Sequence, residues 1–261
     1  MKNDKIEVLK IKISKNGLAT VLNQAVSLIE KKEKFYLCAV NAFMTVKANE
    51  NKKILDIVNT AKIVIPDGMS LVWVSRKFKK YQLDRISGFD FFYEFSKIAN
   101  EKDYSFFFMG GKNSDVLVKI KNRLKCEFNN ILLKGYYSPS LYSHKMPEEE
   151  NKAIIDMVNA CKPDVLWIGI SSPKQEEWIF NSIEKLDIKM ACCVGAVFDF
   201  YSGEINRAPV WMQNHYLEWL YRMYSEPKRL FKKYVIYNTK FMIIVFKNLM
   251  KGSFLKQRYK F

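Results

Sequence analysis

The stretch KPDVLWIGISSPKQEEWIF (162–180), followed eight residues later by KMACCVGAVFDFYSGEINRAP (189–209), decides the predicted fold. It contains two short apolar runs, 165–170 and 190–194, and each run leads into a loop. A helix is predicted to begin in the first loop. Buried strands, small residues and a helix N-terminus in this order are typical of α/β proteins that bind phosphorylated ligands, because backbone N–H groups and the helix dipole face the anion.

Predicted strands and helices alternate along most of the 261 residues. The remaining predicted strands are 6–13, 35–40, 62–65, 104–109 and 131–136. The predicted helices are a segment from Gly17 to about residue 32, then 51–60, 69–78, 89–100, a basic helix after residue 114, and 148–161. This alternation predicts an α/β fold, with a Rossmann-like, mainly parallel sheet or sheets flanked by helices. Two lobes that divide near residue 101 and one continuous sheet both fit the sequence.

The formal net charge of +16 is concentrated at the C-terminal end. Residues 222–261 hold eleven basic residues and one acidic residue, so they carry +10 of that charge. We therefore predict an α/β domain over 1–210 and a basic, aromatic-rich helical appendage over 211–261. A basic block of this kind attracts polyanions, either nucleic acid or an anionic membrane surface.

Lysines recur every seventh residue in the appendage, at Lys233, Lys240 and Lys247, and therefore share one side of a helix. Much of the remaining surface of that helix is apolar. The residues concerned are Tyr234, Tyr237, Phe241, Ile244, Val245 and Phe246. Two interpretations fit this pattern: a helix that lies in a membrane interface, or a helix packed on the protein with a solvated lysine stripe.

No N-terminal signal peptide is recognisable, and no apolar run reaches the roughly 18–20 residues that span a bilayer. We therefore expect a cytoplasmic protein. The two histidines lie far apart in the sequence, and neither a Cys-x-x-Cys nor a D-x-D pattern is present. These features predict a protein that needs no metal and no other cofactor.

Asp67 is the strongest acid–base candidate. It follows a predicted strand and Pro66, precedes Gly68, and so should lie at the carboxyl end of that strand, where ligands of α/β proteins bind. A carboxylate in such a partly desolvated position can accept a proton from a hydroxyl group. The alternative is that Asp67 caps the helix predicted to begin at residue 69.

Several residues near strand ends are candidates for nucleotide contact, although no Walker or G-x-G-x-x-G pattern is present. Residues that contact the nucleotide are predicted in the turns after three strands. These candidates are Gly110, Gly111, Lys112, Gly169, Pro173, Lys174, Glu176 and Gly195. Asp199 can bind ribose hydroxyls or cap a local turn. Each of these turns can also be an ordinary strand-to-helix connection.

Three arginines are neighbours of the aromatic residues in 211–224: Arg207 and Arg229 lie outside the segment and Arg222 lies within it. The planar guanidinium group donates hydrogen bonds in pairs, which suits a diphosphate. The aromatic residues themselves fit either a lipid contact or ordinary packing against the domain.

Taken together, six segments resemble the WecG/TagA/CpsF family of bacterial glycosyltransferases, in the order in which the family carries them. The segments are PDGMSLVW (66–73), RISGFDFF (85–92), FFMGGK (107–112), KPDVLWIGISSPKQEEWI (162–179), VGAVFDFYSGEINRAP (194–209) and LEWLYRMYSEPKRL (217–230). The resemblance implies an inverting enzyme that transfers a sugar from a UDP-sugar to a polyprenyl-diphosphate-linked glycan, peripheral on the inner face of the plasma membrane.

The resemblance also implies roles for individual residues. Asp67 matches the proposed general base, and Asn41, Arg85 and Gln175 match substrate-binding positions. The arginines 207, 222 and 229 are expected to hold the diphosphate. Three departures stand out: Ala39 replaces a threonine, Lys174 replaces an arginine, and Lys232 or Lys233 stands where a third arginine of the C-terminal basic segment is expected. Lysine keeps the charge but not the paired donors of arginine.

Two other classes of function remain open from the sequence. A nucleic-acid-binding module would account for the basic tail, but no RNP-type aromatic strand is present. A nonenzymatic membrane scaffold would account for the appendage without any bound nucleotide. The sugar donated, the acceptor glycan and the oligomeric state are not determined by the sequence.

Overall fold

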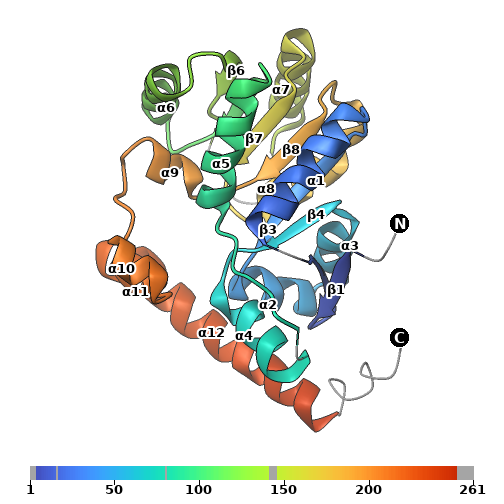
Figure 1. Cartoon of the computed structure of the whole chain (residues 1–261), viewed down its shortest axis with the longest axis vertical. Coiled ribbons are helices and arrows are strands. Elements are labelled where there is room, and N and C mark those ends of the chain that lie inside the picture. Colours follow the sequence, from blue (N-terminus) through green and yellow to red (C-terminus); the bar gives the residue numbers. More distant parts are fainter. Residues whose placement is uncertain (1–3, 16, 80, 141–145, 252–261) are drawn as a thin grey trace.

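A computed structural model describes residues 4–15, 17–79, 81–140 and 146–251 (Figure 1). Six strands form one sheet in the order β4-β3-β8-β7-β5-β6, and every neighbouring pair is parallel. The strands are β3 (Phe35–Val40), β4 (Ile63–Pro66), β5 (Ser105–Gly110), β6 (Leu132–Tyr137), β7 (Val165–Gly169) and β8 (Met190–Cys193). The predicted Rossmann-like α/β fold is confirmed. Strands from both sides of residue 101 belong to this one sheet.

Both faces of the sheet are covered, which explains why its strands are almost uninterrupted apolar runs. Alternate residues of each strand point to opposite faces. In β5, Phe106 and Phe108 belong to one core, whereas Phe107 and Met109 belong to the other. At the centre of the first core lies the fully buried Trp167, which several phenylalanine rings surround at centroid distances between 4.9 and 6.3 Å.

Helices cover the two faces unequally. The first core is closed by α1 (Leu18–Glu30), α5 (Gly88–Glu101), α6 (Ser114–Glu127) and α9 (Val197–Tyr201). The second core is closed by α2 (Ala42–Glu50), α3 (Lys52–Thr60), α4 (Met69–Val74), α7 (Glu148–Cys161), α8 (Lys174–Ser182) and α12 (Pro227–Met250). Two further helices, α10 (Val210–Asn214) and α11 (Glu218–Ser225), connect the α/β part to α12.

The predicted first strand, 6–13, is wrong. The chain instead forms an antiparallel hairpin of β1 (Lys5–Val8) and β2 (Ile11–Ser14), outside the main sheet. Leu9 and Lys10 make its two-residue turn with φ values of 51° and 70°. Positive φ at both positions is the requirement of a type I′ hairpin turn, for which the usual sequence signal is Asn-Gly or Asp-Gly. Leu-Lys carries no such signal, so the sequence gives no sign that the strand predicted over 6–13 is interrupted.

Two helices also differ from expectation. α2 was not predicted, because its apolar residues follow no helical period; Asn41 caps it by accepting a hydrogen bond from the Met44 N–H (3.2 Å). The helix predicted over 69–78 ends as α4 at Val74 and continues as a π-helical segment, Ser75–Lys79.

α12 packs against α2, and the lysine stripe lies close to that contact. Phe241 and Val245 are buried between the two helices, while the Tyr237 ring packs edge-on against Phe43. Lys240 forms an ion pair with Glu50 of α2 (2.7 Å). For most of these apolar residues the structure agrees with the second interpretation, a helix packed on the protein, and Phe246 is the exposed exception among them. The predicted domain boundary at residue 210 stays a prediction.

Two glycines bring the ends of β5 and β7 together, which gives a first test. A Cβ atom at Gly110 would lie 2.5 Å from the backbone of Gly169, and the φ of Gly110 is 135°. We expect Gly110→Ala to lower the free energy of unfolding by at least about 3 kcal/mol, because both clash and strain result. Denaturant unfolding measures the change.

The control is Gly203→Ala. Gly203 also has a positive φ, of 80°, but no atom lies within 4 Å of the position that a Cβ atom would take there. Strain alone should cost about 1–2 kcal/mol at this residue. Equal losses for the two variants would contradict the close approach of β5 and β7.

Candidate active site

A cavity of about 940 Å³ lies at the carboxyl ends of β3, β4, β5, β7 and β8. Because the strands are parallel, the loops that follow them meet at one edge of the sheet. The opposite wall comes from α11 and α12. The predicted site residues that line the cavity are Asn41, Asp67, Arg85, Gly111, Lys112, Gly169, Lys174, Gln175, Gly195, Asp199 and Arg222, together with Ala39.

Asp67 directly follows β4 and does not cap α4. The N-cap of α4 is Gly68, which makes no side-chain capping bond, whereas the Asp67 Oδ1 accepts the backbone N–H of Gly88 (2.9 Å). Gly88 is the first residue of α5, so this carboxylate lies at the positive end of a helix dipole. The alternative interpretation of Asp67 as the cap of α4 is wrong.

Burial raises the pKa of Asp67 above its ordinary value, because a charged carboxylate is poorly solvated there. The Arg85 guanidinium and the N–H of Gly88 oppose this effect, since both stabilise the charged form. The Glu218 carboxylate adds a further rise. A carboxylate whose pKa is raised is a better proton acceptor than an exposed aspartate.

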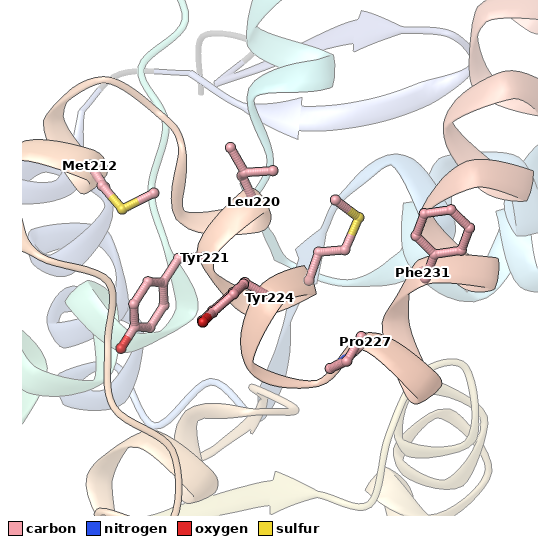
Figure 2. A pocket seen from close by; sticks show the side chains of 7 residues that line it. Met212, Leu220, Tyr221, Tyr224, Pro227 and Phe231 are labelled. Atoms are coloured by element: carbon pink, nitrogen blue, oxygen red, sulfur yellow. The ribbon is translucent and has the colours of Figure 1, made fainter.

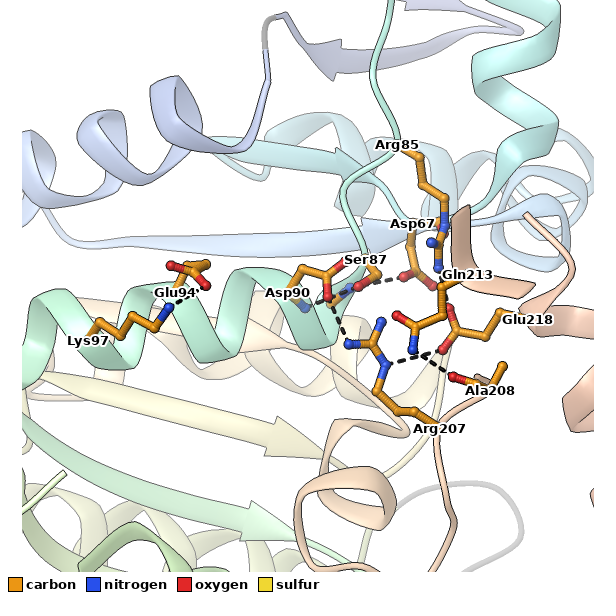
Figure 3. Close-up of polar contacts among 11 residues, drawn as sticks. Asp67, Arg85, Ser87, Asp90, Glu94, Lys97, Arg207, Ala208, Gln213 and Glu218 are labelled. Atoms are coloured by element: carbon orange, nitrogen blue, oxygen red, sulfur yellow. Dashed lines mark hydrogen bonds and ion pairs between the residues drawn. The ribbon is translucent and has the colours of Figure 1, made fainter. Parts of the chain in front are cut away.

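Charged side chains from distant segments of the chain form a network beside Asp67 (Figure 3). Arg85 donates from Nε to the backbone carbonyl of Asp67 (3.0 Å) and from Nη2 to Glu218 Oε2 (2.7 Å). Arg207 donates to Asp90 Oδ1 (2.9 Å) and lies 3.5 Å from the other oxygen of Glu218. Glu218 therefore lies between two arginines.

Gln175 and Glu176 begin α8, and both are almost fully buried. The Gln175 Nε2 donates to Glu176 Oε1 (2.9 Å) and to Ser172 Oγ (3.2 Å), and Ser172 Oγ also donates to Glu176 Oε1 (2.8 Å). Gln175 lines the cavity, and within the described residues its Oε1 has no hydrogen-bond partner. The amide of Gln175 thus offers an acceptor to a bound molecule.

Glu176 does not fit its predicted role in direct nucleotide contact. Its side chain is fully buried and does not line the cavity, because α8 begins two residues earlier and turns it inward. Burial raises the pKa of Glu176 to about 7, against the opposing hydrogen bonds from Gln175 and Ser172. Glu176 instead holds the side chain of Gln175 in place.

Gly110 and Pro173 also do not line the cavity. Gly110 allows β5 to approach β7, and the next residue, Gly111, donates its N–H to the Gly169 carbonyl (3.1 Å). Pro173 is the N-cap position of α8. Both residues shape the turns whose neighbours, Lys112 and Lys174, face the cavity.

The three arginines of the C-terminal part differ in what they can bind. Arg222 lines the cavity, and among the described residues its buried Nε has no hydrogen-bond partner. Arg207 lies outside the cavity wall, with its guanidinium stacked 4.5 Å above the Phe89 ring. The side chain of Arg229 lies outside the part of the chain that the structure describes. Arg222 is therefore the arginine best placed to meet an anion in the cavity.

Sequence reasoning missed some residues of this site. Glu218, Ser172, Tyr216 and Trp219 all line the cavity. For Glu218 a signal exists: it is one of only two acidic residues in 205–261, within the most basic part of the chain. Ser172 and the aromatic residues carry no comparable signal.

In the described part of the chain, no three His, Cys, Asp or Glu side chains are grouped so that they can hold a metal ion. The cationic residues that line the cavity are Arg85, Lys112, Lys174, Arg222 and Lys233. Metal independence stays a prediction.

The buried Glu176 gives a test based on pH. The carboxyl group of Glu176 binds its proton more tightly in the folded state than in the unfolded state. Protonated Glu176 therefore stabilises the fold at low pH, and this stability is lost as the pH rises from about 4.5 through 7. We expect Glu176→Gln to remove this loss, which amounts to about 3 kcal/mol at most. Urea unfolding at a series of pH values measures the slope.

Glu177→Gln is the matched control, since it removes the next carboxylate along the same helix. It should change the slope between pH 5 and 7 far less than Glu176→Gln does, because the Glu177 carboxylate contributes only a minor part of the rise in the pKa of Glu176. A Glu176→Gln variant with the slope of the unsubstituted protein would show that Glu176 is ionised in the folded state at pH 5.

Most of the chain is similar to known proteins. The profile of the WecG/TagA/CpsF family of glycosyl transferases matches residues 6–254. The N-acetylglucosaminyldiphosphoundecaprenol N-acetyl-beta-D-mannosaminyltransferase of Bacillus subtilis (strain 168) is 27% identical over 222 residues, which cover 82% of this chain and 84% of that protein. The chain belongs to the WecG/TagA/CpsF family and is a glycosyltransferase.

Proposed function

We propose that this enzyme transfers a sugar from a UDP-sugar to a glycan linked to polyprenyl diphosphate. The sugar is of the N-acetylmannosamine type or another hexose. The product serves the synthesis of a cell-surface polysaccharide, teichoic acid or exopolysaccharide. One observation carries the proposal: Asp67 and Arg222 line the same cavity. The Nε of Arg222 has no hydrogen bond within the described residues. The name of the Bacillus subtilis relative, a mannosaminyltransferase acting on an undecaprenyl-diphosphate-linked N-acetylglucosamine, supports this acceptor class. Family membership favours an enzyme over the nucleic-acid-binding and scaffold alternatives.

The donor nucleotide is assigned to the turns after β5, β7 and β8. Gly111, Gly169 and Gly195 line the cavity without side chains, so a ligand can approach the backbone there, and Lys112 and Lys174 add positive charge. Asp199, at the beginning of α9, is assigned to the ribose hydroxyls. The amide of Asn41 is oriented by its capping bond to α2, so its NH₂ group is the side left for a ligand.

In the proposed reaction, the acceptor hydroxyl attacks the anomeric carbon of the donor sugar. Its proton passes to the carboxylate of Asp67 while the bond between the anomeric carbon and the β-phosphate oxygen breaks. A single displacement of this kind inverts the anomeric configuration, so an α-linked donor gives a β-linked product. UDP leaves with the electron pair of the broken bond.

Negative charge grows on the leaving diphosphate and needs positive compensation. We assign this role to Arg222, whose Nε is buried without a hydrogen bond in the described region, with Arg207 and Arg229 as further candidates. No metal ion is required in this scheme. Gln175 is assigned to the sugar, because its acceptor oxygen suits a hydroxyl or amide N–H of the donor.

The first test replaces the proposed base. Asp67→Asn should lower kcat on the order of 10²–10⁴-fold while leaving UDP binding intact, since the amide cannot accept the proton. UDP release is measured with a panel of UDP-sugars and a short-chain prenyl-diphosphate-linked N-acetylglucosamine. In the unsubstituted enzyme, turnover should fall as the pH drops through the raised pKa of Asp67.

Asp84→Asn is the control, because Asp84 lies in the same connection but is exposed and paired with Arg76. It should keep normal turnover. Near-normal turnover of Asp67→Asn would exclude Asp67 as the base, and the absence of UDP release with every sugar would exclude the proposed donor class.

We also propose that the appendage binds an anionic membrane surface. No helix in the described residues is long and apolar enough to cross a bilayer. α12 nevertheless exposes an apolar face on the side away from α2, formed by Phe231, Val235, Ile236, Met242, Ile243, Phe246, Leu249 and Met250. An amphipathic helix with such a face and flanking lysines suits the boundary between headgroups and acyl chains.

A shallow apolar groove extends this face toward α10 and α11 (Figure 2). Its volume is about 480 Å³, and its lining residues are Met212, Leu220, Tyr221, Met223, Tyr224, Pro227 and Phe231. Tyr224 is 85% exposed. Because α11 lines the site cavity with its other face, membrane contact here would bring a lipid-linked acceptor close to Asp67.

The membrane proposal predicts a loss of vesicle binding without loss of fold. Ile243→Ser together with Phe246→Ser should weaken co-sedimentation with vesicles of phosphatidylcholine and phosphatidylglycerol by more than about tenfold, given roughly 1.5–3 kcal/mol for each buried apolar side chain. Leu132→Ser, at an exposed apolar position on β6, is the control. Unchanged binding of the double variant would contradict a role for this face.

A further inference from the structure

Glu218 is an isolated acidic residue in a strongly basic region, and it is buried. It is the first residue of α11 and only 8% exposed. Burial of a carboxylate is costly unless opposite charges compensate for it. The compensation comes from Arg85, at 2.7 Å, and Arg207, at 3.5 Å. The chain therefore places this carboxylate where it neutralises two guanidinium groups.

The contact is also the polar link between the appendage and the proposed base. Arg85 holds the backbone carbonyl of Asp67 with one N–H and Glu218 with another, so its guanidinium bridges the end of β4 and the start of α11 (Figure 3). The side chains of Arg85 and Glu218 are 16% and 11% exposed, which means that water competes little for this pair. A change at α11 is thereby transmitted to the position of Asp67.

We propose that Glu218 is a positioning residue: by fixing Arg85, it makes the alignment of Asp67 depend on the docking of α11 against the α/β part. The inference rests on the proposed function of this site. It divides the arginines by task. Arg85 and Arg207 are held by Glu218 and Asp90, whereas Arg222 lines the cavity with a buried Nε that has no hydrogen bond within the described residues. Two nitrogens of Arg207 also lack a hydrogen bond there, but Arg207 does not line the cavity.

This arrangement has a consequence for catalysis. With α11 displaced, Arg85 would lose its partner, and the backbone turn at Asp67 would lose the side chain that holds it. The base would then be misaligned even though every residue of the α/β part is present. The appendage thus contributes a carboxylate to the site as well as its proposed membrane surface.

The test combines single and double substitutions. Glu218→Ala should lower kcat by about 10–100-fold with the KM for the UDP-sugar changed by less than about threefold, because the residue acts on alignment and not on donor binding. Glu218→Gln keeps an oxygen that can accept from Arg85, so it should recover most of this loss. Glu94→Gln, which removes an exposed carboxylate paired with Lys97 on α5, should leave kcat unchanged.

A double-mutant cycle distinguishes positioning from independent effects. If Glu218 acts through Arg85, then adding Glu218→Ala to Arg85→Ala should change kcat by less than about twofold. Losses that multiply would overturn the proposal. Circular dichroism and thermal unfolding verify that each variant is folded. If Glu218→Ala does not fold, the pH profile of Glu218→Gln tests the proposal instead.

The pH profile provides a measurement that a purely structural role would not alter. The charged groups that act on Asp67 are Arg85, Glu218 and Arg222. Glu218→Gln removes the like charge among them, so the acidic limb of the kcat profile should move to lower pH. A limb that stays in place or moves to higher pH would overturn the proposal. If Asp67→Asn retains turnover, the assignment of the base fails, but the cycle between Arg85 and Glu218 still reports their coupling.

Discussion

The common direction of six parallel strands is the constraint on which the rest of this structure depends. Because every strand ends at the same edge, loops that are far apart in the sequence meet around one cavity. The close approach of β5 and β7, made possible by Gly110 and Gly169, brings two of these loops into contact. A sheet of this kind supplies backbone donors at its edge before any side chain is considered.

Buried charge is the second organising feature, and the protein compensates for it locally. Asp67 is held by a helix N-terminus and the arginine beside it, and Glu176 by the amide and hydroxyl of its neighbours. Both carboxyl groups have a raised pKa, but only Asp67 faces the cavity. The same physical effect therefore produces a candidate base at one position and a support for Gln175 at the other.

The appendage joins the two halves of the proposed function. The side of α12 that packs on α2 holds Phe241 and Val245, and its opposite side leaves apolar residues exposed. α11 lies between this surface and the cavity, to which it contributes Glu218 and Arg222. A lipid-linked acceptor needs both a surface where its chain can lie and a cavity where its sugar can react, and α11 borders both.

The sequence by itself determined the α/β class and the position of most strands and helices, because these follow from local apolar periods. It also determined a set of site residues that largely line one cavity, because parallel strands end at the same edge of a sheet. It did not show the turn at Leu9 and Lys10, whose backbone carries no glycine signal. It did not separate the buried Glu176 from the cavity-facing Gln175, since a one-residue rotation on a helix decides which side chain turns inward. Only the tertiary structure showed that Glu218 pairs with Arg85, because these residues lie 133 positions apart. Their pairing depends on how α11 packs, and it leaves no local pattern in the sequence.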